Sequence, residues 1–172
     1  MKRLISPLVI ILFAVTLRIL PHPPNFAPIA GMALFGGAYL NKKYALIVPL
    51  VAMFISDIFL GFHSGIPFVY GSFLIIGLLG IWLRKNKNMK MIILAALSSS
   101  FIFFVITNFG VWLAGSLYPK TVDGFVQCYL YALPFFRNTI IGDLFYTGLF
   151  FGSYELLLNF LVKKSIIKQI GS

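Results

Sequence analysis

The positive charges of this chain gather in four short clusters, and the stretches between the clusters are apolar. Eleven of the fourteen Lys and Arg residues belong to these clusters. They are Lys2 and Arg3, Lys42 and Lys43, Arg84 with Lys85, Lys87 and Lys90, and Lys163 with Lys164 and Lys168. Each intervening stretch is long enough to cross a bilayer twice. Because cationic loops beside membrane helices tend to stay in the cytoplasm, the pattern predicts three out-and-back passages with both termini inside.

The composition also favours a membrane protein. Hydrophobic residues make up 60% of the 172 residues and charged residues 10%, and the mean hydropathy is +0.97. A water-soluble domain of this size needs more charge on its exterior. The net charge of +10 falls at the ends of predicted helices, so we expect no nucleic-acid partner. The sequence predicts one integral domain over residues 1–172, with the lipid bilayer around it.

Breaks in the apolar pattern divide the chain into six predicted helices. Pro24 disfavours a helical conformation for the residue before it, so a turn at residues 22–25 separates the first two helices. The predicted spans are 4–20, 26–40, 44–62, a fourth from the turn at 61–67 to about 83, 91–117 and 134–162. Residues 125–133 are expected to form an interfacial or re-entrant segment before the last span. The expected fold is an all-α membrane protein, a six-transmembrane-helix bundle.

Small residues are concentrated in the second predicted helix. Ala27 and Gly31 are four residues apart, as are Ala33 and Gly37, so each pair lies on one helix face. Such pairs allow two backbones to approach closely. Two interpretations stay open, namely packing inside the bundle and a docking face for another membrane protein.

The polar side chains of the predicted helices lie mainly in the outer half of the membrane, where they indicate a cavity. Asp57 is about 20 Å from the cytoplasmic end of its helix at the α-helical rise, and Asp143 lies in the outer half or near the middle of the last helix. Intramembrane polar groups usually face an interior, and aromatic rings with a few polar groups suit a small organic ligand. The candidate substrate-binding residues are Asn108, Trp112, Arg137, Asn138, Asp143, Asp57, His22 and His63.

Several of these residues fit a second interpretation. The planar guanidinium of Arg137 suits a carboxylate or phosphate on a ligand. Asp57 and Asp143 are equally consistent with structural ion pairs to Arg18 and Arg137. Trp112 is also consistent with the interfacial aromatic belt of a membrane protein.

Motifs of catalysis are missing from the sequence. It contains no His-Glu-x-x-His, no phosphate-binding glycine loop and no Gly-x-Ser-x-Gly elbow. Gly142 and Asp143 match half of the Gly-x-Gly-Asp signature of intramembrane aspartyl proteases, but Ile140 occupies the first glycine position. We therefore expect neither an enzyme nor a bound cofactor or metal.

The arrangement resembles the substrate-binding S components of energy-coupling-factor (ECF) vitamin transporters, which are small, basic six-helix proteins with an outward-facing cavity. The segment 25–38, the basic turn after it, Pro49 and Asp57-x-x-x-Gly61 carry this likeness. The chain resembles more closely an uncharacterised bacterial membrane protein family. The shared motifs are His22-Pro-Pro-Asn-Phe, Ser56-Asp57 with Gly61-Phe62-His63, Thr107-Asn-Phe-Gly-Val-Trp112, and Pro134-Phe-Phe-Arg-Asn-Thr139 with Gly142-Asp143.

The resemblance implies uptake of a small vitamin-like nutrient across the cytoplasmic (inner) membrane of a bacterium by a multi-pass subunit. Its partner would be an ECF energising module, made of a transmembrane subunit and ATPases. Residues 4–20 lack the Ala-x-x-x-Ala docking motif of S components, so a solitary subunit is a second form. A proton-coupled carrier that uses Asp57, Asp143 and Glu155, or a non-transport assembly partner of another membrane complex, stays open.

Overall fold

The computed structural model describes residues 7–170, with side chains for 11–42 and 44–160. Within these residues the chain is all-helical and has no strand, as the sequence predicts. The helices are α1 (Pro7–Ile19), α2 (Ile29–Tyr39), α3 (Lys42–Leu60), α4 (Ile66–Leu83), α5 (Met89–Ala114) and α6 (Val122–Ile170). Their number and order agree with the prediction, and the bounds of α1 to α5 differ from it by three residues or fewer.

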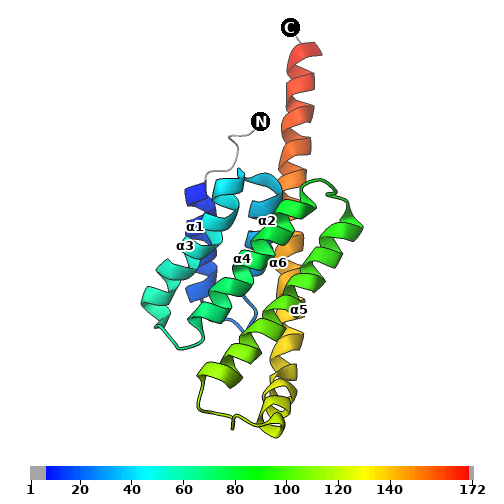
Figure 1. Cartoon of the computed structure of the whole chain (residues 1–172). Helices are drawn as coiled ribbons and strands as arrows, with labels where there is room; N and C mark the ends of the chain where they lie inside the picture. The colour runs from blue at the N-terminus through cyan, green and yellow to red at the C-terminus, as the bar shows by residue number, and fades with distance from the viewer. Residues whose placement is uncertain (1–6, 171–172) are drawn as a thin grey trace.

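Successive helices alternate in direction along the bundle (Figure 1). The α2–α3 and α4–α5 connections lie at the end from which the last turns of α6 project, and the other three connections lie toward the opposite end. The basic residues Lys42, Arg84, Lys85, Lys87 and Lys90 belong to the first of these ends. Lys2 and Arg3 lie outside the described residues, as do the side chains of the last cluster. The two described clusters therefore share one end of the molecule.

Two described helices, α4 and α5, are long and apolar enough to cross a membrane. Residues 29–39 and 44–60 form shorter apolar helices. Large apolar side chains are exposed on the surface, among them Phe59 (70%) and Phe101 (61%), and such a surface suits contact with lipid. These features support a membrane protein. The eleven residues of α2 measure only about 17 Å, short of a hydrocarbon core of about 30 Å.

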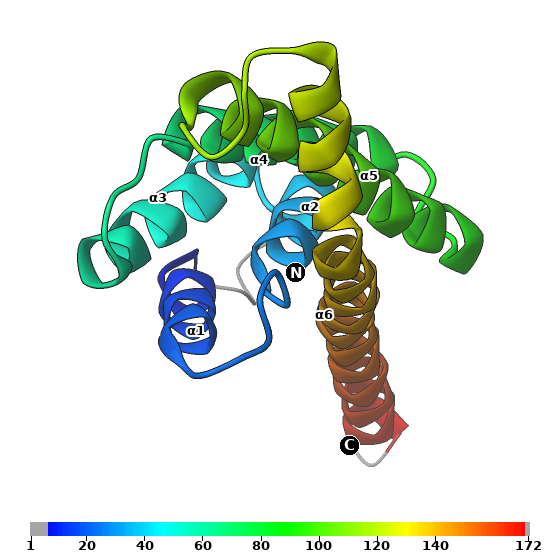
Figure 2. The same cartoon turned by 90° about the horizontal axis from the view of Figure 1, so that it is seen from below.

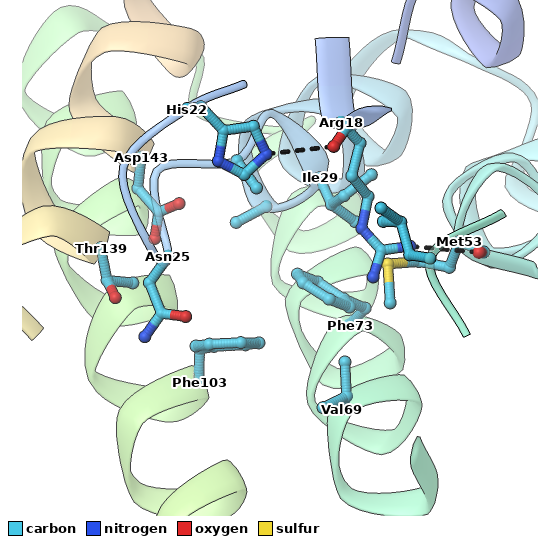
Figure 3. Close-up of a pocket in the computed structure, with 13 residues that line it drawn as sticks. Arg18, His22, Asn25, Ile29, Met53, Val69, Phe73, Phe103, Thr139 and Asp143 are labelled. Atoms are coloured by element: carbon cyan, nitrogen blue, oxygen red, sulfur yellow. Dashed lines mark hydrogen bonds between the residues drawn. The ribbon is translucent and has the colours of Figure 1, made fainter. Parts of the chain in front are cut away.

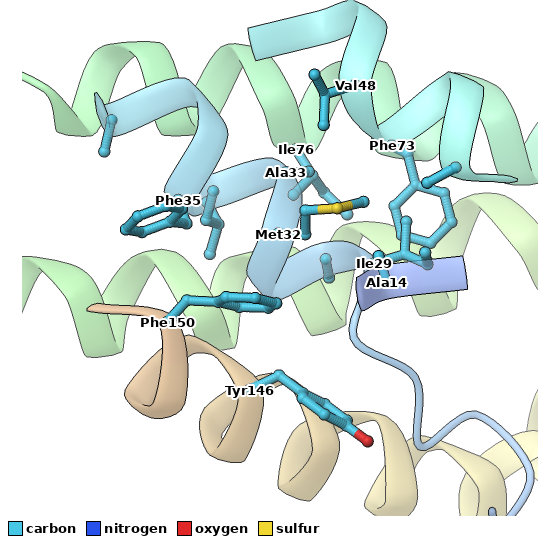
Figure 4. Packing of buried hydrophobic residues seen from close by; sticks show 14 of the residues in the cluster. Ala14, Ile29, Met32, Ala33, Phe35, Val48, Phe73, Ile76, Tyr146 and Phe150 are labelled. Carbon is cyan, nitrogen blue, oxygen red and sulfur yellow. The ribbon is translucent and has the colours of Figure 1, made fainter. Parts of the chain in front are cut away.

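Helix α2 is the centre of the core. All residues from Ile29 to Ala38 are buried, and Figure 4 shows Met32 and Ala33 between side chains of α3, α4 and α6. A Cβ atom on Gly37 would lie 2.5 Å from the carbonyl carbon of Gly80 in α4, and one on Gly31 would lie 2.9 Å from a backbone nitrogen of α6. The small residues of α2 therefore serve packing inside the bundle.

Helix α6 is longer than the sequence predicts. Residues 125–133, expected as an interfacial or re-entrant segment, form its first turns, and Pro134 lies inside the helix. Proline removes one backbone hydrogen bond and bends a helix. Figure 2 shows the bundle from below, with the first turns of α6 in yellow. The remainder of the helix continues from them, away from the viewer, to its red C-terminal end.

Candidate functional site

A cavity of about 250 Å³ lies among α1, α2, α3, α4, α5 and α6, beside the α1–α2 connection (Figure 3). It lies toward the end of the bundle opposite to the two basic clusters at the α2–α3 and α4–α5 connections. A mainly apolar wall with a few convergent polar groups is typical of small-molecule sites. The lining residues are Arg18, His22, Asn25, Ala27, Ile29, Ala30, Met53, Leu60, Val69, Phe73, Phe103, Thr139 and Asp143.

Arg18, in the last turn of α1, forms one wall and is held there by α3. Its Nη1 donates to Asp57 Oδ1 at 2.7 Å and to the carbonyl oxygen of Met53 at 3.1 Å, and it also contacts Ser56 Oγ. The hydroxyl of Tyr70 donates to the second carboxylate oxygen of Asp57 at 2.7 Å. The side chain of Asp57 is only 2% exposed. Arg18 and Asp57 therefore form the structural ion pair that was the second interpretation of Asp57.

Asp143 forms the opposite wall, from α6. The residue is 3% exposed, and its Oδ2 accepts a hydrogen bond of 2.7 Å from Ser100 Oγ in α5. No other hydrogen bond or ion pair reaches this carboxyl group from the side chains that the structure describes. Arg137, the predicted alternative partner, is exposed and makes no ion pair with it in the described part of the chain. Asp143 thus keeps one oxygen atom for a ligand.

The α1–α2 connection supplies the rim of the cavity. His22 Nε2 lies 3.1 Å from the carbonyl oxygen of Arg18, and Nδ1 lies 3.0 Å from that of Pro23. Asn25 has a positive φ of 62°, a backbone conformation that Asn tolerates better than most residues. This turn places the Asn25 side chain near Thr139 on the α6 side of the cavity (Figure 3).

Two predicted site residues of α5 lie away from the cavity. Asn108 Nδ2 donates to the carbonyl oxygen of Phe104 in its own helix at 2.7 Å. Trp112 Nε1 donates to the carbonyl oxygen of Pro119 at 3.0 Å, and the Nζ atom of Lys120 lies 5.8 Å from the centre of its ring. Asn108 therefore bonds to its own helix, and Trp112 ties α5 to the α5–α6 connection.

The remaining predicted residues lie on the surface or support the rim. Asn138 Nδ2 donates to the carbonyl oxygen of Pro24 at 3.1 Å and so ties the α1–α2 connection to α6. Arg137 and His63 are exposed, and neither lines the cavity. Of the eight predicted residues, the structure brings His22 and Asp143 into the cavity wall. Asp57 reaches it through Arg18.

Several residues that line the cavity are not among the predicted site residues. Thr139 carried a usable signal, because it lies one turn before Asp143 and shares its helix face. Phe73 and Phe103 carried none, since the chain contains nineteen phenylalanines. Ser100, the hydrogen-bond partner of Asp143, lies 43 residues away in sequence, and only the packing of α5 on α6 joins the two.

The other half of the bundle is packed and mainly apolar. Phe35 of α2 lies against Phe150 and Phe151 of α6, with ring centres 5.9 and 5.5 Å apart. At the far end the hydroxyl of Tyr39 donates to Glu155 Oε1 at 2.7 Å. These aromatic rings therefore lie between the cavity and the end that carries the basic clusters of the α2–α3 and α4–α5 connections.

Comparison with known families places this chain without assigning an activity. The chain belongs to a family described as a family of unknown function (DUF6580), whose sequence model matches residues 1–165. No curated protein and no solved structure matches it. The cavity and its lining residues are therefore the observations on which a function must rest.

Proposed function

We propose that this member of the DUF6580 family is a membrane-embedded binding subunit for uptake of a small, vitamin-like organic nutrient. The observation that carries the proposal is the cavity of about 250 Å³ with Arg18 and Asp143 on opposite walls and aromatic rings between them. Polar groups persist in membrane helices mainly where they face an interior or a ligand. The subunit resembles ECF S components in its predicted spans and in the side on which the cavity lies.

In this proposal the chain crosses the inner membrane of a bacterium six times, with both termini in the cytoplasm. The described basic residues at the α2–α3 and α4–α5 connections mark the cytoplasmic side, following the positive-inside rule. The cavity then faces outward. Helix α2 is too short to cross the membrane alone, and its burial among α3, α4 and α6 keeps its ends away from lipid.

Ligand enters past the rim formed by His22 and Asn25 and settles between Arg18 and Asp143. Release inward requires rearrangement, because Phe35, Phe150 and Phe151 close the inner half of the bundle. Nothing in the sequence resembles an ATP-binding motif, so energy from ATP would come from an ECF-type module of a transmembrane subunit and ATPases. A solitary subunit would instead release its ligand without ATP.

The direct test is mass spectrometry of small molecules extracted from the purified protein. We expect a metabolite that disappears in Ala27→Phe, because Ala27 lines the cavity and a phenyl ring there fills it. Ala114→Phe is the matched control, since Ala114 is exposed at the end of α5. A wild-type protein that yields no metabolite, or a metabolite retained by a folded Ala27→Phe variant, contradicts the proposal.

The second candidate is a proton-coupled carrier, and two buried groups of α6 favour it. Asp143 lines the cavity, and Thr147 Oγ1, one turn further along, is buried with no hydrogen-bond partner in the described part of the chain. Glu155 lies about 18 Å beyond Asp143 along the helix. This candidate predicts that the lone protein in liposomes takes up the extracted metabolite in response to a pH gradient. Uptake at the same rate with and without a pH gradient would contradict this second candidate.

A further inference from the structure

The charges around the cavity point to a class of ligand. We propose that the cavity binds a small organic cation, a protonated amine attached to a flat apolar group, with Asp143 as its counter-ion. This inference rests on the proposed function, because it concerns the ligand of the same site. Its basis is the buried carboxyl group of Asp143, which makes no ion pair with either of the basic side chains that line the cavity, Arg18 and His22.

Arg18 lines the cavity but is already paired. Its Nη1 is bound to Asp57, whose other oxygen accepts from Tyr70. The formal charges of Arg18 and Asp57 cancel, so this pair leaves the cavity wall neutral. An anionic ligand would be left with Nε and Nη2 of Arg18, which make no hydrogen bond among the described residues, and its charge would be repelled by the Asp57 carboxylate 2.7 Å from Nη1. Capture of a carboxylate or phosphate by Arg18 is therefore disfavoured.

His22 also forms no ion pair with Asp143 in the described part of the chain. Both of its ring nitrogens lie at backbone carbonyl oxygens, at 3.1 Å from Arg18 and 3.0 Å from Pro23. Neither nitrogen lies within ion-pair distance of the Asp143 carboxyl group. The two basic side chains that line the cavity thus leave Asp143 without a cationic partner.

Asp143 itself has a single hydrogen bond within the described residues. Ser100 donates to Oδ2 at 2.7 Å, and no described donor reaches Oδ1. Burying an ionised carboxylate is costly unless a cation and further hydrogen bonds compensate it. An ammonium group on a ligand supplies the positive charge and the missing N–H donors together. Asn25 and Thr139, which line the same side, offer oxygen acceptors for its remaining protons.

The remainder of the cavity suits a small, flat apolar group. The rings of Phe73 and Phe103 lie 5.3 Å apart between centres and both face the cavity. Aromatic faces attract both apolar rings and cations. The cavity volume of about 250 Å³ equals the share of about eight liquid water molecules. A ligand of one ring with a short ammonium-bearing arm fills this space.

A metal cation fits these residues less well. The residues that the structure describes contain no group of three His, Cys, Asp or Glu side chains that could hold a metal ion. Divalent calcium and magnesium require several oxygen ligands, often from more than one carboxylate, and Asp143 is the only unpaired carboxylate among the described lining residues. An organic cation needs only this one carboxylate.

The test compares three probes that share one ring and differ in charge, namely benzylammonium, benzyl alcohol and benzoate. Each is titrated against the full-length purified protein while its thermal unfolding is recorded. Ligands that bind the folded state raise the unfolding temperature. We expect benzylammonium to raise it at concentrations at which benzoate does not. Asp143→Asn should weaken the benzylammonium response at least tenfold, whereas Asp123→Asn, at an exposed acid in the first turn of α6, should preserve it.

Equal responses to benzylammonium and benzoate, no response to benzylammonium, or an unchanged response in Asp143→Asn would overturn the inference. If Asp143→Asn does not fold, the preference of the wild-type protein among the three probes decides. The outcome is separable from that of the proposed function. A co-purified metabolite without a cationic group overturns the ligand class and leaves nutrient binding in place, whereas loss of the proposed function requires that no metabolite depends on Ala27.

Discussion

Replacing Gly37 by alanine should destabilise the bundle where α2 meets α4. A Cβ atom added at Gly37 would lie 2.5 Å from the carbonyl carbon of Gly80, and 2.6 Å from both the Cα of Gly80 and the backbone nitrogen of Ile81. All three neighbours are backbone atoms of a helix, so no side chain can rotate away. Ordinary van der Waals contact begins near 3.4 Å, and α2 and α4 must therefore separate locally by about 1 Å.

The expected cost follows from that separation. Inserting a methyl group into a closely packed core costs about 1–3 kcal/mol, and we expect the upper part of this range because rigid backbone faces rigid backbone. The Cβ position of Gly80 is equally crowded, 2.6 Å from the carbonyl oxygen of Leu34. Neither helix therefore has a free direction in which to yield.

The assay is reversible unfolding of the purified protein in mixed micelles, followed by loss of tertiary structure. Gly148→Ala provides the matched control, because no atom lies within 4 Å of the added Cβ on this exposed glycine of α6. We expect its free energy of unfolding to stay equal or to rise by up to about 1 kcal/mol, because alanine favours an exposed helix interior more than glycine does. Equal stabilities of Gly37→Ala and Gly148→Ala would refute the close contact of α2 with α4.

Two further predictions concern the ion pair and the topology. Arg18→Met should lower the free energy of unfolding by about 3–5 kcal/mol, because it leaves Asp57 buried without its cation. Arg18→Met combined with Asp57→Asn should cost less than the sum of the single changes, and Arg137→Met, at an exposed arginine, should cost no more than about 0.5 kcal/mol. For the topology, single cysteines are placed in a background that lacks Cys128. Ser64→Cys should react with an impermeant thiol reagent applied to intact cells, whereas Lys87→Cys should react only after the cells are permeabilised. The reverse labelling pattern would invert the proposed orientation.

The sequence predicts the helices well because their signals are local. Apolar runs, the prolines of the turn at 22–25 and the basic clusters each act within a few residues. It fails at residues 125–133, where Pro134 reads as the start of a helix although it lies inside α6. Proline is compatible with both positions, and only the packing of α6 against α5 distinguishes them. The central place of α2 is likewise decided by contacts with other helices.

The site was predicted less completely, because its residues meet only through packing between distant segments. His22 and Asp143 were identified as polar residues of the outer half, and both line the cavity. Asn108 and Trp112 carried the same signal, yet their polar atoms bind backbone oxygen atoms of α5 and of the connection after it. Sequence composition cannot tell a polar group that satisfies the local backbone from one that faces a cavity.

The two intramembrane aspartates show what decides between structure and ligand binding. Asp57 and Asp143 are both almost fully buried. Asp57 has a guanidinium on one oxygen and a phenol on the other, whereas Asp143 has a single hydroxyl. Removing the partner of a satisfied buried charge destabilises the fold, whereas a buried carboxyl group without a cation has no such partner to lose and gains from a ligand that brings one. The proposed ligand therefore depends on the absence of a cation beside Asp143 among the side chains that the structure describes.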